Sequence, residues 1–132
     1  MSAGAIDGGR GARRPSTNIT TGRQGEDIAA AWLTAAGMSV LERNWRCRDG
    51  EVDIVAIDAD VVVLVEVKTR RGPIGGHPFE AITPQKVARL RRLASRWVAE
   101  HPADRPRRLR LDAVAVRMHA TGEHVEHIRG IV

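Results

Sequence analysis

The segment from Val61 to Lys68 constrains the fold most, because it is a nearly unbroken run of Val and Leu that ends in two charges. A run of this kind without turn residues is typical of a strand that is covered on both faces. Glu66 and Lys68 are two residues apart, so on a strand their side chains point to the same face. A buried carboxylate needs positive compensation, and Lys68 supplies it only in part.

A second strand-like run, from Gly50 to Ala56, places another carboxylate, Asp53, in mid-strand. If the two runs form a hairpin through the turn at residues 58–60, Asp53 comes close to Glu66. Two carboxylates and a lysine at the end of a buried sheet then predict a site for a divalent metal ion.

Length and composition limit the classes of protein to consider. A chain of 132 residues is expected to form one domain, and no apolar run is long enough to span a membrane. The first residues lack a secretory signal pattern, and the single Cys47 cannot form an internal disulfide, so a cytoplasmic protein is expected. The formal net charge of +5 and the pI of about 10.9 favour polyanionic partners.

Only two of the 21 basic residues are lysines, Lys68 and Lys86. Lys68 therefore stands out beside Glu66 in an arginine-rich chain. A site that needs a compact, titratable amine would require a lysine there, because a guanidinium cannot replace it.

Residues 1–18 are rich in Gly, Ala, Arg and Ser and are expected to form a disordered basic tail, which leaves residues 19–132 as the domain.

The apolar spacing then predicts a helix from Thr21 to Ala36 that stops at Gly37. Glu26 in its first turn allows two interpretations. Its charge suits the helix dipole there, or its side chain points inward to the metal site.

A second helix is predicted to begin at Thr83-Pro84, with Thr83 as the N-cap. A polar and basic stripe follows one face of this helix, and a Gly- and Pro-rich loop with two arginines and His77 precedes it. The stripe is either a solvated face or a surface for a phosphate backbone. The candidate nucleic-acid-binding residues are Arg70, Arg71, Gln85, Arg89, Arg92 and Arg96.

Three further strands are predicted, over residues 38–46, 109–118 and 123–128. Asp112 lies on the second of these, either as the partner of a nearby arginine or as a third site carboxylate. His124 and His127 are three residues apart, which places them on opposite faces of an extended segment and excludes a metal pair.

The resulting order is helix, three strands, helix and two strands, and the acidic residues fall on the second and third strands. Asp53 followed by Glu66-Val67-Lys68 resembles the signature of the PD-(D/E)XK nucleases. Five segments, Gly22–Glu26, Arg43–Arg46, Gly50–Asp53, Val65–Arg70 and Leu111–Ala115, resemble the YraN-type family of uncharacterised bacterial proteins, which is similar in fold to Holliday junction resolvases. The resemblance implies an α/β fold with a restriction-endonuclease-like core, in which helices flank a central mixed sheet of about five strands.

The resemblance also implies roles for individual residues. Asp53, Glu66 and the backbone carbonyl of Val67 would hold Mg²⁺ or Mn²⁺, since hard cations prefer oxygen ligands. Lys68 would orient or deprotonate the attacking water, Glu26 matches the first-helix glutamate of the resolvases, and Gln85 resembles a polar residue that some nucleases of this superfamily place on the following helix. Val52 stands where the signature's name has Pro.

The expected function is that of a metal-dependent endonuclease, which hydrolyses phosphodiester bonds in structured or branched DNA. The partner would be nucleic acid, with DNA favoured, and a homodimer would suit the cutting of two strands. The alternative is a nucleic-acid-binding module that keeps the nuclease fold without catalysis, and a third interpretation is a protein-binding scaffold in which Glu66 and Lys68 form only an ion pair.

Overall fold

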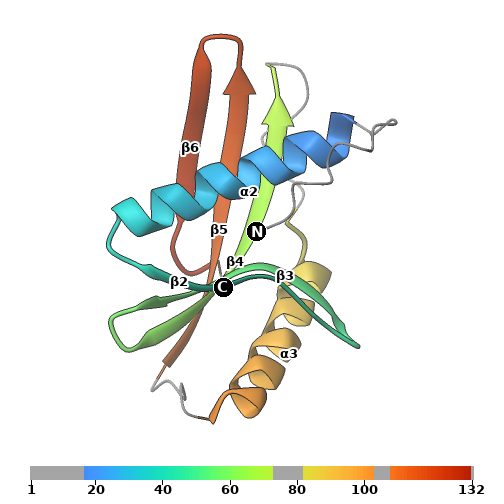
Figure 1. The fold of residues 1–132 in the computed structure, drawn as a ribbon. Coiled ribbons are helices and arrows are strands. Elements are labelled where there is room, and N and C mark those ends of the chain that lie inside the picture. Colours follow the sequence, from blue (N-terminus) through green and yellow to red (C-terminus); the bar gives the residue numbers. More distant parts are fainter. Residues whose placement is uncertain (1–16, 73–81, 103–107, 132) are drawn as a thin grey trace, which may run out of the picture.

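The computed structural model describes residues 17–72, 82–102 and 108–131, with side chains from Gly22 onward. These residues form two helices and five strands in the predicted order (Figure 1). The elements are α2 (Thr17–Ala35), β2 (Ser39–Cys47), β3 (Gly50–Asp58), β4 (Val61–Arg71), α3 (Pro84–Glu100), β5 (Arg108–His119) and β6 (Gly122–Ile128). The loop histidine His77, most of the basic tail and the 103–107 linker lie outside the described residues.

The five strands make one mixed sheet in the order β2-β3-β4-β5-β6. β2, β3 and β4 follow one another as antiparallel neighbours, β4 and β5 run parallel, and β6 returns antiparallel to β5. A parallel pair needs a crossover, and α3 lies within the segment that supplies it. The predicted α/β class and mixed sheet of about five strands are therefore confirmed.

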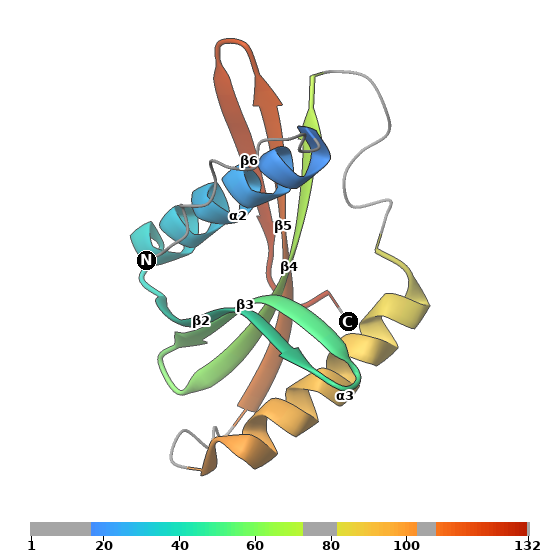
Figure 2. The same cartoon turned by 45° about the vertical axis from the view of Figure 1, so that its right-hand side comes forward.

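A hydrophobic cluster lies on each face of the sheet, and each cluster is closed by one helix (Figure 2). α2 buries Ala29 and Leu33 against alternate residues of β4, including Val63 and Val65. α3 buries Leu90, Leu93, Ala94 and Trp97 against the other face, where Val62 and Leu64 lie. The strand from Val61 to Val65 is thus covered on both faces, as its unbroken apolar run predicts.

Local chemistry explains where several elements end. Thr83 accepts a hydrogen bond from the Lys86 N–H at 3.2 Å and caps α3, with Pro84 in the first turn. Gly37 after α2 and Gly50 at the β2–β3 turn have φ values of +99° and +140°, which favour glycine. The expected helix stop at Gly37 and the expected hairpin turn at residues 58–60 are therefore confirmed.

The predicted start of the first helix is wrong. α2 begins at Thr17, so its first turn carries no acidic residue and Glu26 lies well inside the helix. The helix-dipole interpretation of Glu26 no longer applies, because that effect is confined to the terminal turn.

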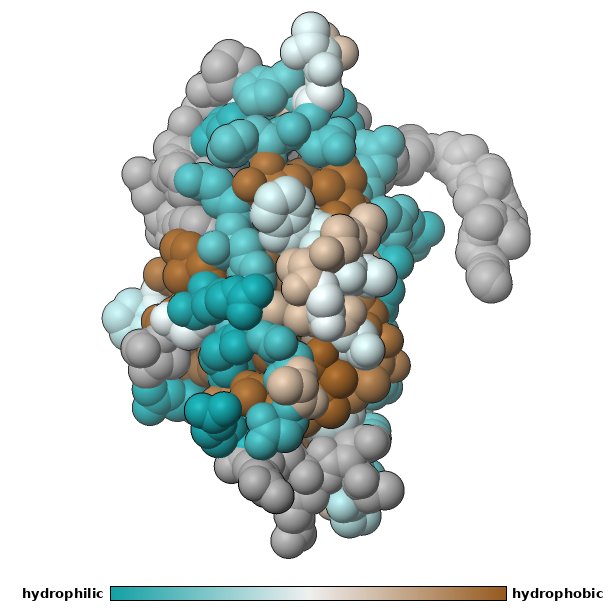
Figure 3. Space-filling view, turned by 90° about the vertical axis from the view of Figure 1, so that its left-hand side faces the viewer, coloured by the Kyte–Doolittle hydropathy of each residue, from teal (hydrophilic) through white to brown (hydrophobic). Residues whose placement is uncertain are grey.

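A groove of about 710 Å³ lies between α2 and the edge strand β6. Figure 3 views the side of the molecule that carries the end of α2 and β6, and apolar and weakly polar residues are exposed there among hydrophilic ones. Ile28, Ala31, Trp32 and Val125 supply the apolar lining of the groove. Asp53, Glu66 and Lys68 do not line this groove, so the predicted metal site lies elsewhere.

Candidate functional site

The candidate site forms where β3 and β4 separate. Their ladder runs from Asp58 opposite Val61 to Ile54 opposite Val65 and ends there, so Asp53 and Glu66 are the next residues on the two strands. In place of a further ladder bond, the Val67 N–H donates to Asp53 Oδ2 at 2.7 Å. The Asp53 carboxylate thus takes the place of a strand partner for β4.

A kink in β3 directs Asp53 toward β4. Residues two apart on a regular strand share a face. Val52, however, packs in the cluster under α3, and Ile54 packs in the cluster under α2, so the two lie on opposite faces of the sheet. Opposite the kink, the ladder to β2 omits Asn44, which has a left-handed φ of 53°. The side chain of Asp53 therefore projects along the sheet into the space that the parting strands leave.

Glu66 and Lys68 share a face of β4, as predicted. Lys68 Nζ lies 3.4 Å from Glu66 Oε2, and Glu66 is buried with 7% of its surface exposed. Both side chains lie on the face that Val62 and Leu64 share with α3. The ion pair is confirmed, and it lies directly beside the Asp53–Val67 contact.

The neighbouring acidic groups raise the proton affinity of Asp53. Burial raises the pKa of Asp53 to about 7 despite the hydrogen bond from Val67, and the charges of Glu66, Glu26 and Glu51 raise it further. Ionisation of Asp53 at neutral pH is therefore unfavourable, because burial and the neighbouring carboxylates both oppose it.

Glu26 faces this cluster from α2. Burial raises its pKa, a hydrogen bond with Asn44 and the charge of Arg43 lower it, and Glu51 and Asp27 raise it again. Arg43 Nη2 lies 3.8 Å from Glu26 and 2.7 Å from Asp27. The side chain of Glu26 is 19% exposed, and its charge raises the pKa of Asp53, so its role in a metal site stays a prediction.

Gly25 is a packing position beside the candidate site, and the sequence interpretation gave it no role of its own. It lies in α2 against β4, where a Cβ atom would overlap the side chain of Thr69. The absence of a side chain lets the helix lie directly on the strand, and the next residue, Glu26, is thereby brought toward Asp53. A glycine inside a helix, costly by propensity alone, was the available signal.

The candidate basic residues occupy different surroundings. Arg92 and Gln85 are exposed on α3, whereas Arg96 donates to Asp49 at 3.2 Å and lies 3.3 Å from Glu100. Arg89 packs over Gly50 at the β2–β3 turn. The stripe is therefore partly engaged by the hairpin rather than uniformly open to solvent.

The two arginines at the end of β4 have polar partners on the protein. Arg70 Nη1 donates to the carbonyl of Thr69 at 3.1 Å, and Arg71 Nη2 donates to Gln24 of α2 at 3.0 Å. Both positions lie beyond Lys68 on the same strand, so a ligand at the acidic cluster would reach them by following β4.

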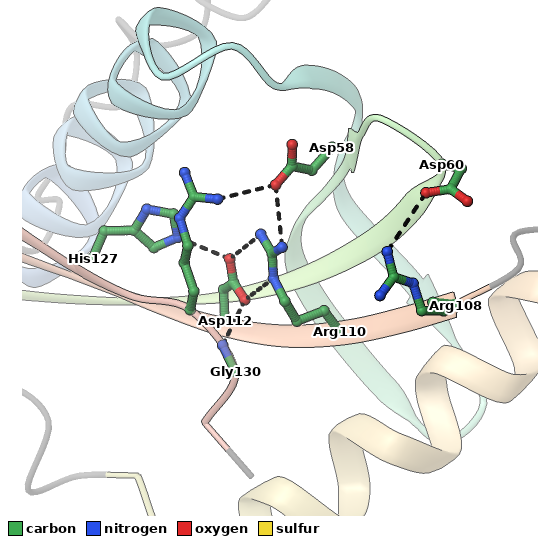
Figure 4. A network of polar contacts seen from close by, with 8 residues as sticks. Asp58, Asp60, Arg108, Arg110, Asp112, His127 and Gly130 are labelled. Atoms are coloured by element: carbon green, nitrogen blue, oxygen red, sulfur yellow. Dashed lines mark hydrogen bonds and ion pairs between the residues drawn. The ribbon is translucent and has the colours of Figure 1, made fainter.

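Asp112 belongs to a separate network (Figure 4). Its side chain is fully buried and accepts two hydrogen bonds from Arg110, one from the Gly130 N–H and one from His127 at 2.8 Å. Burial raises the pKa of Asp112, but these hydrogen bonds outweigh it and the pKa is lowered. The interpretation of Asp112 as the partner of an arginine is confirmed.

Within the described ranges, no group of three or more His, Cys, Asp or Glu side chains is arranged to hold a metal ion. A cation at the Asp53–Glu66 pair would therefore need oxygen atoms from the backbone or from a ligand. Neither α2 nor α3 has the length and apolar character of a membrane-crossing helix.

Comparison with known proteins identifies one family. The model of the uncharacterised protein family UPF0102 matches residues 25–116. The chain is 54% identical over 111 residues to a UPF0102 protein of Kineococcus radiotolerans, which covers 83% of this chain and 91% of that protein. It is 56% identical to those of Beutenbergia cavernae and Streptomyces coelicolor, over 83% of this chain and 93% and 86% of theirs.

Proposed function

We propose that this chain, which belongs to the uncharacterised protein family UPF0102, is a metal-dependent endonuclease that hydrolyses phosphodiester bonds in structured or branched DNA. Membership of the family confirms the family expected from the sequence segments, but the names of its members state no activity. The proposal therefore rests on the site and on its resemblance to the PD-(D/E)XK nucleases with their restriction-endonuclease-like core.

One observation carries the proposal: Asp53 bridges to Val67 at the point where β3 leaves β4, next to the Glu66–Lys68 pair. A buried acidic cluster with one adjacent ion-paired amine is an expensive arrangement for a fold to keep without a ligand. The raised pKa of Asp53 expresses the same cost, because it reports unfavourable ionisation at neutral pH.

The donor atoms fit a hard divalent cation such as Mg²⁺ or Mn²⁺. Asp53 and Glu66 supply carboxylate oxygens. In an extended strand the N–H and C=O of one residue point to the same side, so the Val67 carbonyl faces the side on which Asp53 lies. A cation bound there would supply Lewis-acid stabilisation of charge on the phosphate, and phosphate oxygens would complete its ligands.

The protein's own groups have distinct roles in this proposal. The Lys68 amine, held 3.4 Å from Glu66, would orient the attacking water and offset negative charge on phosphorus. Glu26 would complete the acidic cluster from α2. The exposed Arg92 and the arginines at the end of β4 would hold the phosphate backbone leading to the site.

The test is cleavage of junction, flap and single-stranded DNA by the purified protein with Mn²⁺. Asp53→Asn and Glu66→Gln keep the side-chain shapes and remove the charges, and each is expected to lower the cleavage rate by at least about 100-fold. Asp60→Asn is the matched control, since Asp60 is exposed at the β3–β4 turn.

Cleavage that neither site variant changes would assign the activity to a contaminant. If the wild-type protein cleaves none of the substrates but binds DNA in a salt-sensitive and metal-independent way, the non-catalytic binding module is the correct function.

A further inference from the structure

The strand β6 forms one edge of the sheet, and no other described strand pairs with its outer side (Figure 1). The opposite edge, β2, is irregular, because its ladder to β3 shifts between Val40 and Glu42. The β5–β6 ladder has no such shift, and β6 contains neither Pro nor Lys. An irregular ladder, Pro and Lys commonly keep an edge strand from pairing with another chain. β6 therefore remains open to such pairing.

Two backbone hydrogen bonds identify the groups of β6 that face outward. The Met118 carbonyl accepts from the N–H of Gly72, just after β4, whereas the Leu111 carbonyl accepts from the N–H of Ile131, just after β6. Even-numbered residues of β5 therefore face β4, and odd-numbered ones face β6. The residues of β6 opposite these odd-numbered ones are even-numbered, and they use their backbone groups to bond β5. The backbone groups that point to the free edge belong to Glu123, Val125 and His127.

The sequence of β6 complements itself when two copies run antiparallel. If Val125 lies opposite Val125 of a second copy, then His124 lies opposite Glu126, and Glu123 lies opposite His127. The outward backbone groups of residues 123, 125 and 127 then meet one another in hydrogen-bonded pairs. No like charges lie directly opposite in this register, and the exposed His124 can donate to the carboxylate of Glu126.

The apolar groove beside β6 lies on the same face of the sheet as Val125. Val125 packs against the cluster under α2, and it lines the groove together with Ile28, Ala31 and Trp32. Trp32 is 44% exposed, and Figure 3 shows the apolar residues that are accessible on this side. A two-fold axis perpendicular to the sheet keeps α2 of both copies on one face, so the two grooves meet across the axis. Pairing of β6 would therefore also cover exposed apolar surface.

We propose that β6 is a self-association surface through which two copies of this chain pair antiparallel, with Val125 at the two-fold axis. The two five-stranded sheets then become one continuous sheet. This assigns the homodimer expected from the sequence to a particular strand and register. The proposal does not depend on nuclease activity, because it rests on the backbone groups and side chains of the edge strand alone.

Disulfide trapping tests the register. In a Cys47→Ala background, Val125→Cys places the only thiol of the full-length chain at the proposed axis. Opposite Cα atoms of a hydrogen-bonded antiparallel pair are about 5.5 Å apart, which a disulfide can span. Mild oxidation is expected to convert most of this protein into a covalent dimer. Thr121→Cys is the matched control at the exposed β5–β6 turn, because its two copies would lie roughly 27 Å apart, too far for a disulfide.

Opposite charge changes at His124 test the pairing without a cross-link. His124→Glu places like charges opposite one another at two symmetric positions and is expected to weaken the dimer by about tenfold, whereas His124→Lys is expected to strengthen it by about threefold. His119→Glu is the control, since it makes the same charge change at an exposed position on β5, one strand in from the edge. Sedimentation equilibrium measures the dissociation constants, and that of the control is expected to equal the wild-type value.

The proposal is overturned if the protein is monomeric at every concentration measured, if Thr121→Cys is trapped as readily as Val125→Cys, or if the two changes at His124 alter the dissociation constant alike. A monomer that binds an extended peptide at β6 also overturns it, because the edge would then serve a different partner. None of these measurements contains DNA or a divalent cation, so their outcome is separate from that of the cleavage test.

Discussion

The carboxylate of Asp53 accepts a hydrogen bond from the backbone N–H of Val67 at 2.7 Å, across the point where two neighbouring strands part. The contact couples a titratable side chain on β3 to the backbone of the strand that carries Glu66 and Lys68. Protonation of Asp53, its hydrogen bond and the charge of the site are therefore linked.

The first prediction concerns pH and stability. The pKa of Asp53 is raised from 3.8 to about 7 in the folded protein, so between these values the folded state binds more protons than the unfolded state. The contribution of Asp53 to the free energy of unfolding is then greatest below about pH 4 and is lost as the pH rises to about 7. The difference corresponds to roughly 4 kcal/mol at most.

Urea denaturation between pH 5 and 8 measures this effect. The side chain in Asp53→Asn can still accept the hydrogen bond from Val67 but cannot ionise. The free energy of unfolding of the variant, relative to that of the wild-type protein, is therefore expected to increase with pH and to level off above about pH 7. At pH 8, Mg²⁺ is expected to stabilise the wild-type protein and not the variant. A constant difference between the two proteins at all pH values contradicts the raised pKa.

The second prediction concerns the close approach of α2 to β4. Gly25→Ala is expected to destabilise the protein by about 1–3 kcal/mol, because the added Cβ overlaps the Thr69 side chain. Gly22→Ala is the matched control: apart from the backbone of its own helix and its chain neighbours, no atom of the described residues lies within 4 Å of its Cβ position, and alanine there is expected to stabilise the helix by up to about 1 kcal/mol. Thermal unfolding of both variants compares them, and equal effects would refute the close contact.

The third prediction separates the structural carboxylate from the site. Asp112→Ala leaves Arg110 and His127 without their buried partner and is expected to cost about 3 kcal/mol or more. Loss of the exposed Asp60–Arg108 pair, at 3.9 Å, is expected to cost less than about 1 kcal/mol. Chemical denaturation measures both changes in the free energy of unfolding. A small effect of Asp112→Ala would show that the network in Figure 4 contributes little to the stability of the fold.

The fourth prediction distinguishes two arginines on α3. Replacing the exposed Arg92 by alanine is expected to reduce the slope of log affinity against log salt for duplex DNA by about 0.9, the value for one lost phosphate contact. Arg96→Ala is expected to change the slope less, because Asp49 and Glu100 already compensate its charge. Fluorescence anisotropy at several salt concentrations measures the slopes, and a larger effect of Arg96→Ala would reverse this assignment.

The start of α2 shows why part of the fold was mispredicted. Four of the five residues from Thr17 to Thr21 are Thr or Asn, and each of these residue types is a good N-cap. Local chemistry therefore offers several starts of similar free energy, and the apolar spacing does not choose among them. The start of α3 was predictable because Thr83-Pro84 offers a specific cap followed by a residue that fits only the first turn.

The sequence by itself determined which segments become strands and which face Glu66 and Lys68 share, because side-chain alternation and turn chemistry act over a few residues. Only the tertiary structure decided that the β3–β4 ladder ends at Ile54 and that a kink aims Asp53 at Val67. These features depend on how helices pack against the two faces of the sheet. Such long-range contacts leave no periodic trace in the residues that make them.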